Sequence, residues 1–289
     1  MNYSTLLKKI GAYEKKYKIN TIGQTLLGRK IIAVEKVVDE SFFTAIFVAS
    51  VHARENITTD LLCKFLDDGV FDDIKDFNVS IILMANPDGV ELSYFGLSSV
   101  CDEELKKKLL IANNKNSDFS FWKSNARGVD INNNFDAQFE KHVSSYKMSS
   151  QGFAGEFAES ELETQAIINF IKTKKVFFVV SYHSKGEEIY FNFFQSQKNK
   201  ERDEKIANQF SKSTGYKIVN VEKVSSGGLK DWCVEKLKIP SLTIEIGNDN
   251  LCHPIKEKYL NEIFLRHKNI ANDLNFAYNV FIDYKIKVK

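Results

Sequence analysis

Cysteine is scarce in this chain: its 289 residues include four cysteines, and no two of them form a CxxC pair. Such wide spacing is typical of reduced thiols rather than of a disulfide framework, which favours the cytoplasm as the location. The first ten residues hold no sustained apolar segment, so we expect neither a secretory signal nor a membrane anchor. The rest of the chain also lacks an apolar stretch long enough to cross a bilayer.

An excess of charge of either sign is also missing. Forty basic and thirty-eight acidic residues give a formal net charge of +2. This balance creates no global field to attract nucleic acid, and we expect neither nucleic acid nor a membrane as a partner. There is no internal repeat and no low-complexity linker. With 43% hydrophobic residues the chain can bury a large core, and we predict one domain over residues 1–289.

Apolar runs that alternate with helical patterns predict an α/β fold. The expected strands cover residues 31–34, 44–50, 77–84, 176–182, 188–193 and 241–246. The expected helices cover about 6–13, 58–65, 100–112, 160–171, 200–213, 228–236 and 256–277. Because strands alternate with helices, we predict a central, twisted, mixed but mostly parallel sheet with helices on both faces.

Two irregular segments separate these elements. Asn86-Pro87-Asp88-Gly89 is expected to end a strand as a turn, because Pro and Gly stop regular structure. Residues 117–150 are rich in Asn, Ser and Asp, which in a compact domain is typical of a functional loop.

The most informative motif is His52-Ala53-Arg54-Glu55, which directly follows the apolar run 45–49. Catalytic zinc is held by three protein ligands with a fourth position open, and two His plus one Glu is a standard set. A His-x-x-Glu pair also arises by chance, so a third ligand is needed. His183 follows a second apolar run, and Glu245 is the one carboxylate in a third, where an unpaired buried acid would be costly.

These residues lie within a series of motifs that occur in a family order. The chain resembles the M14 zinc carboxypeptidase family in residues 22–29, 86–89, 128–132, 182–184 and 226–232. Within that family, residues 122–130, 182–191 and 240–247 look most like the bacterial γ-D-glutamyl-L-diamino acid (meso-diaminopimelate) peptidases. The resemblance implies a zinc carboxypeptidase-like fold and a zinc metallopeptidase.

The resemblance also implies roles for individual residues. His52, Glu55 and His183 correspond to the ligands of one zinc ion, the set known for carboxypeptidases, and Glu245 corresponds to the general base. The family has an arginine seven positions before the aspartate of Gly-Val-Asp, which stabilises charge in the transition state; here that position is Lys123. Arg127 is the nearby alternative for this role.

Four further residues correspond to the substrate groove. Arg54 matches a groove arginine, although an exposed arginine is as often a plain surface residue. Lys230 stands at the floor of the pocket for the leaving group, and a buried ammonium favours an acidic leaving group. Carboxypeptidases usually have an arginine after Asn132 to clamp a terminal carboxylate, but this chain has Asn133. A diaminopimelate unit, with its extra carboxylate, fits both substitutions.

Three interpretations follow from these residues. The first is a cytoplasmic zinc peptidase that cleaves γ-D-glutamyl-meso-diaminopimelate bonds in cell-wall peptides. The second is a metallocarboxypeptidase that releases acidic C-terminal residues from ordinary peptides. The third is a catalytically inactive, peptide-binding relative, which has no need of Glu245. A thiol nucleophile is disfavoured because neither Cys233 nor Cys252 has a Cys-His signature.

Overall fold

The computed structural model describes residues 1–141, 145, 147–219 and 226–286. Within these residues the chain forms one eight-stranded sheet in the order β1-β2-β4-β3-β5-β8-β6-β7. The strands are β1 (Lys18–Gln24), β2 (Lys30–Lys36), β3 (Thr44–Val48), β4 (Asn78–Ile82), β5 (Val176–His183), β6 (Glu188–Tyr190), β7 (Lys217–Ile218) and β8 (Ser241–Glu245).

The centre of this sheet is parallel and its flanks are mixed. The ladders β4-β3, β3-β5 and β5-β8 are parallel, whereas β1-β2, β2-β4 and β6-β8 are antiparallel. Every residue of β3 and β4 is buried, as expected for parallel strands that are covered on both faces. The predicted mixed, mostly parallel α/β sheet is confirmed.

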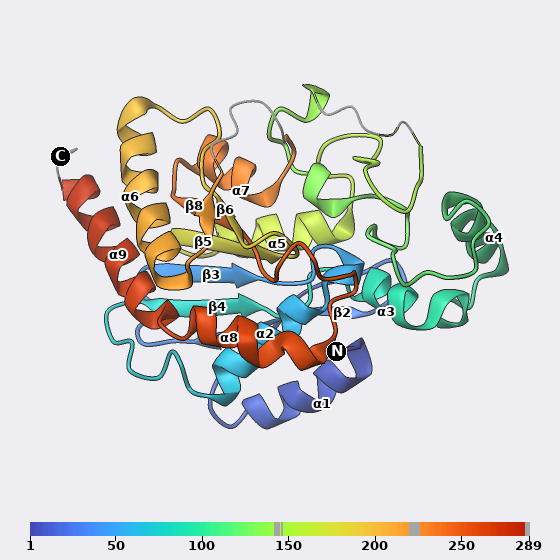
Figure 1. Ribbon diagram of the computed structural model, residues 1–289, viewed down its shortest axis with the longest axis horizontal. Coiled ribbons are helices and arrows are strands. Elements are labelled where there is room, and N and C mark those ends of the chain that lie inside the picture. The colour runs from blue at the N-terminus through green and yellow to red at the C-terminus, as the bar shows by residue number, and fades with distance from the viewer. Residues whose placement is uncertain (142–144, 146, 220–225, 287–289) are drawn as a thin grey trace.

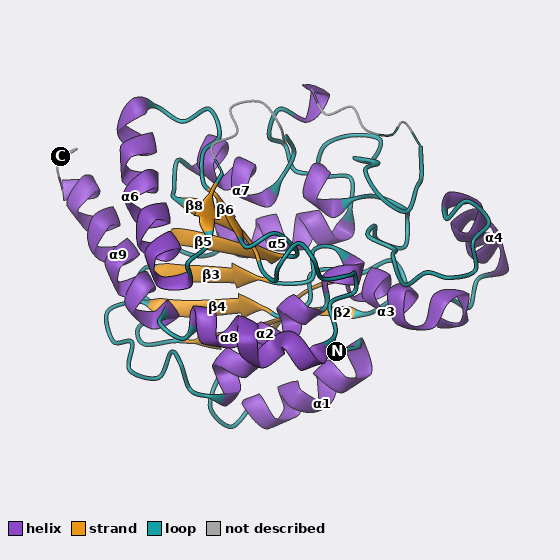
Figure 2. Ribbon diagram, in the orientation of Figure 1, coloured by secondary structure: helices purple, strands orange, loops and turns teal. Residues whose placement is uncertain are grey.

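Helices cover both faces of the sheet. In Figures 1 and 2, α2, α6, α8 and α9 lie on one face, and α5 and α7 lie on the other. The helices are α1 (Tyr3–Tyr13), α2 (Ile57–Asp67), α3 (Pro87–Phe95), α4 (Glu103–Ala112), α5 (Leu162–Lys172), α6 (Gln197–Thr214), α7 (Leu229–Trp232), α8 (Leu260–His267) and α9 (Ile270–Ile286). Within the described part of the chain, no helix combines the length and apolar character needed to cross a membrane.

Several boundaries differ from the sequence-based expectation. The turn predicted at residues 86–89 instead starts α3, because the Asn86 side chain accepts a hydrogen bond from the Gly89 N–H and Pro87 occupies the first turn. The expected helix over 256–277 is divided into α8 and α9. Strand β1 was not predicted, because its half-buried pattern lacks an apolar run; α5 covers it, with Ala166 packed against Gly23.

Three strand ends place the candidate residues at one edge of the sheet. His183 is the last residue of β5 and Glu245 is the last residue of β8. His52 follows the end of β3 by four residues. These strands are parallel neighbours, so their carboxyl ends share an edge, at the arrowheads on the right of Figure 1. Ligand sites of open α/β sheets lie outside such an edge.

Candidate metal centre

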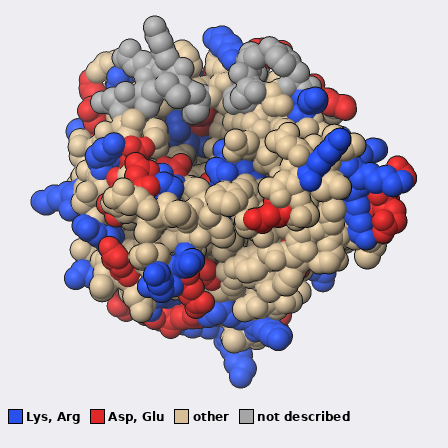
Figure 3. Space-filling view, turned by 45° about the vertical axis from the view of Figure 1, so that its right-hand side comes forward, with Lys and Arg blue, Asp and Glu red and all other residues tan. Residues whose placement is uncertain are grey.

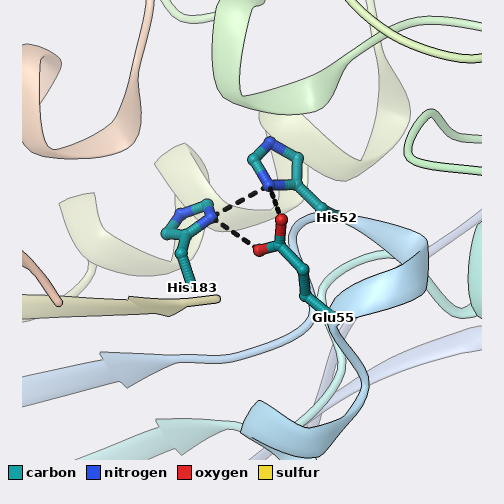
Figure 4. Close-up of side chains that lie close together, drawn as sticks. All are labelled: His52, Glu55 and His183. Carbon is teal, nitrogen blue, oxygen red and sulfur yellow. Dashed lines mark hydrogen bonds and ion pairs between the residues drawn. The ribbon is translucent and has the colours of Figure 1, made fainter. Parts of the chain in front are cut away.

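Two imidazoles and one carboxylate converge at the carboxyl edge of the sheet (Figure 4). His52 precedes the 3-10 turn Ala53–Glu55, so backbone geometry brings His52 and Glu55 to the same side. The Nδ1 atom of His52 lies 2.9 Å from Glu55 Oε1 and 3.0 Å from His183 Nδ1. His183 Nδ1 lies 3.1 Å from Glu55 Oε2. All three side chains are buried, so little water is present to separate them.

The hydrogen bonds around this cluster leave lone pairs that face one another. His52 Nε2 lies 3.1 Å from Asp130 Oδ1; an ionised carboxylate only accepts, so in the neutral ring Nε2 carries the proton. Nδ1 then presents its lone pair to Glu55 and His183. Burial acts to lower the pKa of His52, but the Glu55 carboxylate raises it above the ordinary value. The cluster therefore needs positive charge at its centre, either a proton or a metal ion.

The donor set fits a zinc ion. Ligand atoms at about 2.0–2.1 Å from a tetrahedral zinc are roughly 3.3 Å apart, and the contacts in the cluster measure 2.9–3.1 Å. Among the described residues, His52, Glu55 and His183 form the group able to hold a metal ion. Burial acts to raise the pKa of Glu55, yet the two histidines hold it well below its ordinary range. The carboxylate is thus ionised, as a metal ligand must be.

Each histidine is oriented by a partner behind it. Asp130 accepts a hydrogen bond from His52 Nε2, and the Ser181 hydroxyl lies 2.9 Å from His183 Nε2. Such outer partners fix the ring so that the other nitrogen faces the metal. Asp130 is the aspartate of the Gly-Val-Asp motif, and no role was predicted for it from the sequence. The signal available in the sequence was a carboxylate within a loop predicted to be functional. Its partner, His52, lies 78 residues away in the chain, so the sequence did not indicate the pairing.

Glu245 lies beside the metal centre. It is the register partner of His183 in the parallel β5-β8 ladder, and it also faces Glu188 of β6. Burial raises the pKa of Glu245 well above its ordinary value, and the negative charge of Glu55 adds to this effect. A carboxyl group with a raised pKa binds a proton more readily than an ordinary carboxylate does, which suits proton transfer during catalysis.

Lys123 and Arg127, the two candidates for stabilising the negative charge of the transition state, have different surroundings. Lys123 Nζ lies 3.0 Å from Asp130 Oδ2, and the Lys123 backbone carbonyl accepts a hydrogen bond from the N–H of Ala53, which lies between two of the predicted ligands. Burial acts to lower the pKa of Lys123, but Asp130 and then Glu55 raise it above the ordinary value. The side chain of Arg127 is 45% exposed, and its Nε lies 3.8 Å from Glu161.

The predicted groove residues are held by loop contacts. Arg54 is half-buried, and its Nη1 donates to the Phe121 carbonyl at 3.3 Å and to Gln151 Oε1 at 3.4 Å. Asn132 Oδ1 accepts from Leu229 N–H at 3.2 Å, which joins the 117–150 loop to α7. Asn133, also half-buried, packs its backbone against Gly227.

Lys230 is buried, as predicted, but its counter-ion is a residue of the same chain. Its ammonium forms an ion pair with Asp231 and donates to the Asn192 carbonyl at 3.0 Å. The ring centroid of Phe193 lies 5.4 Å from Nζ, a cation–π distance. Asp231 also accepts from Gly228 N–H, so the Lys230–Asp231 pair is built into the start of α7.

The two buried cysteines are poor nucleophiles. Burial raises the pKa of the Cys63 thiol to about 12 and that of Cys233 still further, which argues against thiolate chemistry. Figure 3 shows Lys and Arg interspersed with Asp and Glu over the drawn face, in keeping with the small net charge.

A comparison with protein families decides the classification. The model of the family described as zinc carboxypeptidase, Peptidase_M14, matches residues 3–270. The chain belongs to the zinc carboxypeptidase family. It is therefore a metallopeptidase by family, and the family prediction from the motifs is confirmed.

Individual relatives of this zinc carboxypeptidase family member are distant. The chain is 28% identical to gamma-D-glutamyl-L-diamino acid endopeptidase 1 of Lysinibacillus sphaericus, over 89% of this chain and 68% of the relative. It is 26% identical to carboxypeptidase A1 of Bos taurus, over 78% of this chain and 56% of the relative. The chain thus spans about half to two thirds of the length of these proteins.

Solved structures show the same fold at low sequence identity. Thrombin activatable fibrinolysis inhibitor has a TM-score of 0.73 at 18% identity, with 96% of this chain and 73% of that chain covered. The murein-tripeptide amidase MpaA of Escherichia coli O157 has a TM-score of 0.58 at 21% identity, with 88% and 90% covered. These likenesses support the fold assignment.

Proposed function

We propose that the chain is a zinc-dependent peptidase that hydrolyses γ-D-glutamyl-meso-diaminopimelate bonds in peptides derived from the cell wall. The observation that carries the proposal is the convergence of His52, Glu55 and His183 beside Glu245. A zinc ion held by these three ligands would polarise the scissile carbonyl and make a water molecule more acidic. The free cysteines are typical of a reducing compartment and favour the cytoplasm as the place of action.

Glu245 has the position and the proton affinity of a general base. It lies next to His183, and burial together with Glu55 raises its pKa. Glu245 would take a proton from the attacking water and pass it to the leaving amine, which is the general acid–base sequence expected for amide hydrolysis. An inactive peptide-binding relative would have no use for this arrangement.

Lys123 is the better candidate for stabilising the negative charge that develops on the substrate oxygen. Its ammonium is within electrostatic reach of both Glu55 and Glu245 and is fixed by Asp130. A preorganised cation of this kind stabilises the transition state more than the ground state. Arg127 is partly exposed and lies against Glu161 instead.

The proposed substrate rests on the Lysinibacillus relative and on the groove residues. If Lys230 and Asp231 line the leaving-group pocket, they present both signs of charge. The side chain of diaminopimelate ends in an ammonium and a carboxylate, so it matches an ion pair better than a lone carboxylate does. Arg54, Asn132 and Asn133 would contact the peptide backbone, and Asn133 provides no cation for a terminal carboxylate.

A two-variant experiment tests the metal and the base separately. Glu245→Gln should keep about one zinc per chain and lower turnover of a γ-D-glutamyl-meso-diaminopimelate peptide by at least about a hundredfold, the scale of losing a general base. His183→Ala should lose both zinc and turnover. Metal content is measured by plasma mass spectrometry. Near-normal turnover of zinc-loaded Glu245→Gln would assign the base to another residue.

A substrate comparison tests the leaving group. The peptides carry diaminopimelate, diaminopimelate with an amidated main-chain carboxylate, or lysine, which lacks the side-chain carboxylate. We expect kcat/KM to tolerate amidation better than the change to lysine. Lys230→Met should reduce the preference for diaminopimelate over lysine by about 2–5 kcal/mol, the range for truncating one partner of a buried pair. If amidation is the more damaging change, or a peptide ending in glutamate is preferred, the chain is a carboxypeptidase for acidic residues.

A further inference from the structure

We infer that the chain has a second binding site, for a small amphipathic anion with an apolar body and a carboxylate. The site is a groove of about 630 Å³, at the edge of the sheet opposite the metal centre. Val176 lies in the groove at the start of β5, whereas His183 ends the same strand. Seven residues of strand separate the two sites by roughly 23 Å. In Figure 1 the amino ends of β3 and β5 lie on the left, beside α9.

The floor of the groove is apolar. Phe43 and Phe281 contact each other edge to face, with ring centroids 5.3 Å apart. Aliphatic side chains from the end of α5, the start of β5 and the segment before β8 complete it: Ile171, Val176, Leu237 and Ile239. Phe281 and Ile239 retain 9% and 8% exposure. The groove is open to solvent, and its volume lies within the range of about 300 to 1,000 Å³ for small-molecule sites.

Four lysines surround this floor: Lys172, Lys174, Lys175 and Lys285. Lys174 forms an ion pair with Glu35. Lys175 donates to the Ser41 carbonyl at 3.1 Å, and Lys285 Nζ lies 4.2 Å from the centroid of the Phe43 ring. Apart from Lys174, none of these lysines has a carboxylate within ion-pair distance in the described part of the chain. The charge of Lys175 helps to lower the pKa of Asp39, but the two side chains do not form an ion pair.

The combination of floor and rim defines the ligand. The whole chain carries a net charge of only +2, so three ammonium groups without carboxylate partners around one groove are a local concentration. An uncharged apolar ligand would form no ion pair with the lysines. A bare inorganic anion would leave the apolar floor exposed to water. An apolar chain that ends in a carboxylate satisfies both. A groove of this volume can hold a small ligand. A protein partner would need an interface that buries upwards of about 1,000 Å² of surface.

Calorimetric titration of the full chain with decanoate tests this site. The groove variant Lys175→Glu/Lys285→Glu should bind decanoate about tenfold more weakly than the unchanged protein, as expected for loss of two partly exposed ion pairs. Added salt should weaken binding in the unchanged protein. Lys8→Glu/Lys15→Glu makes the same change of net charge on exposed residues outside the groove, and it should bind as the unchanged protein does.

Further binding measurements distinguish the proposed ligand from other classes of partner. Leu237→Gln removes part of the apolar floor without altering charge, and it should also weaken decanoate binding. Decyltrimethylammonium has the same chain with a cationic head and should not bind. Equal decanoate binding by groove and control variants would overturn the proposal. Tighter binding of phosphatidylserine vesicles or polyglutamate than of decanoate, lost in the groove variant, would overturn it in favour of a membrane or protein surface. Peptidase activity should be unchanged in both lysine variants.

Discussion

Replacing Glu163 by glutamine should stabilise the protein in a pH-dependent way. Glu163 lies in the first turn of α5 and is only 2% exposed. Its Oε2 accepts a hydrogen bond from Asn125 Nδ2 at 3.1 Å, and the same amide donates to Glu161 at 2.7 Å. Glu163 Oε1 is buried and has no hydrogen-bond partner among the residues that the structure describes. Burial, with the nearby charges of Asp88 and Glu161, raises the pKa of Glu163 from 4.5 to about 7.

The sign and the size of the effect follow from this pKa. Between pH 4.5 and pH 7 the folded chain keeps a proton on Glu163 that the unfolded chain has released. The free energy of unfolding therefore falls as the pH rises through this window, and the cost is fully present above pH 7. The difference between the two pKa values corresponds to about 3 kcal/mol. Below pH 4.5 both states are protonated and the cost disappears.

Urea unfolding at pH 5 and at pH 8 measures this difference. Because Glu163→Gln has no charge at either pH, its stability gain over the unchanged protein should be about 2 kcal/mol larger at pH 8 than at pH 5. The amide oxygen can still accept the Asn125 hydrogen bond. Glu156→Gln, at an exposed position in the same loop region, serves as the control and should show no such change. A gain in Glu163→Gln that is equal at both pH values would refute the assignment of a buried, protonated Glu163.

Three further predictions concern the site. Asp130→Asn should weaken zinc binding by about ten- to a hundredfold, measured by chelator competition, because it removes the carboxylate behind His52; unchanged affinity would mean that Asp130 does not orient the ligand. Lys123→Met should lower kcat with zinc retained and Arg127→Met should change it far less, and the reverse order would move the oxyanion role to Arg127. Gly227→Ala should lower the melting temperature, because its φ is +81° and a Cβ would lie 2.4 Å from the Asn133 carbonyl oxygen; an unaltered melt would contradict the described loop packing.

Local sequence patterns predicted the residues of the candidate metal centre. His52 and His183 each lie three positions beyond the end of an apolar run that forms a buried strand, and buried parallel strands end at a common edge. Patterns with weaker local signals were misread. β1 has no apolar run because its residues are half-buried, and Asn86-Pro87 was assigned to a turn although the same residues cap a helix.

The sequence by itself determined which side chains could bind a metal and where the strands that carry them end. Only the tertiary structure decided the pairings, such as His52 with Asp130 and Lys174 with Glu35. The physical reason is that any of the many carboxylates in the chain could neutralise a given cation. Which one does so depends on strand order and loop path, and these are set by packing between residues far apart in the sequence. The lysine-rimmed groove exists for the same reason, because its residues come together only when α5, α9 and the segment before β8 meet.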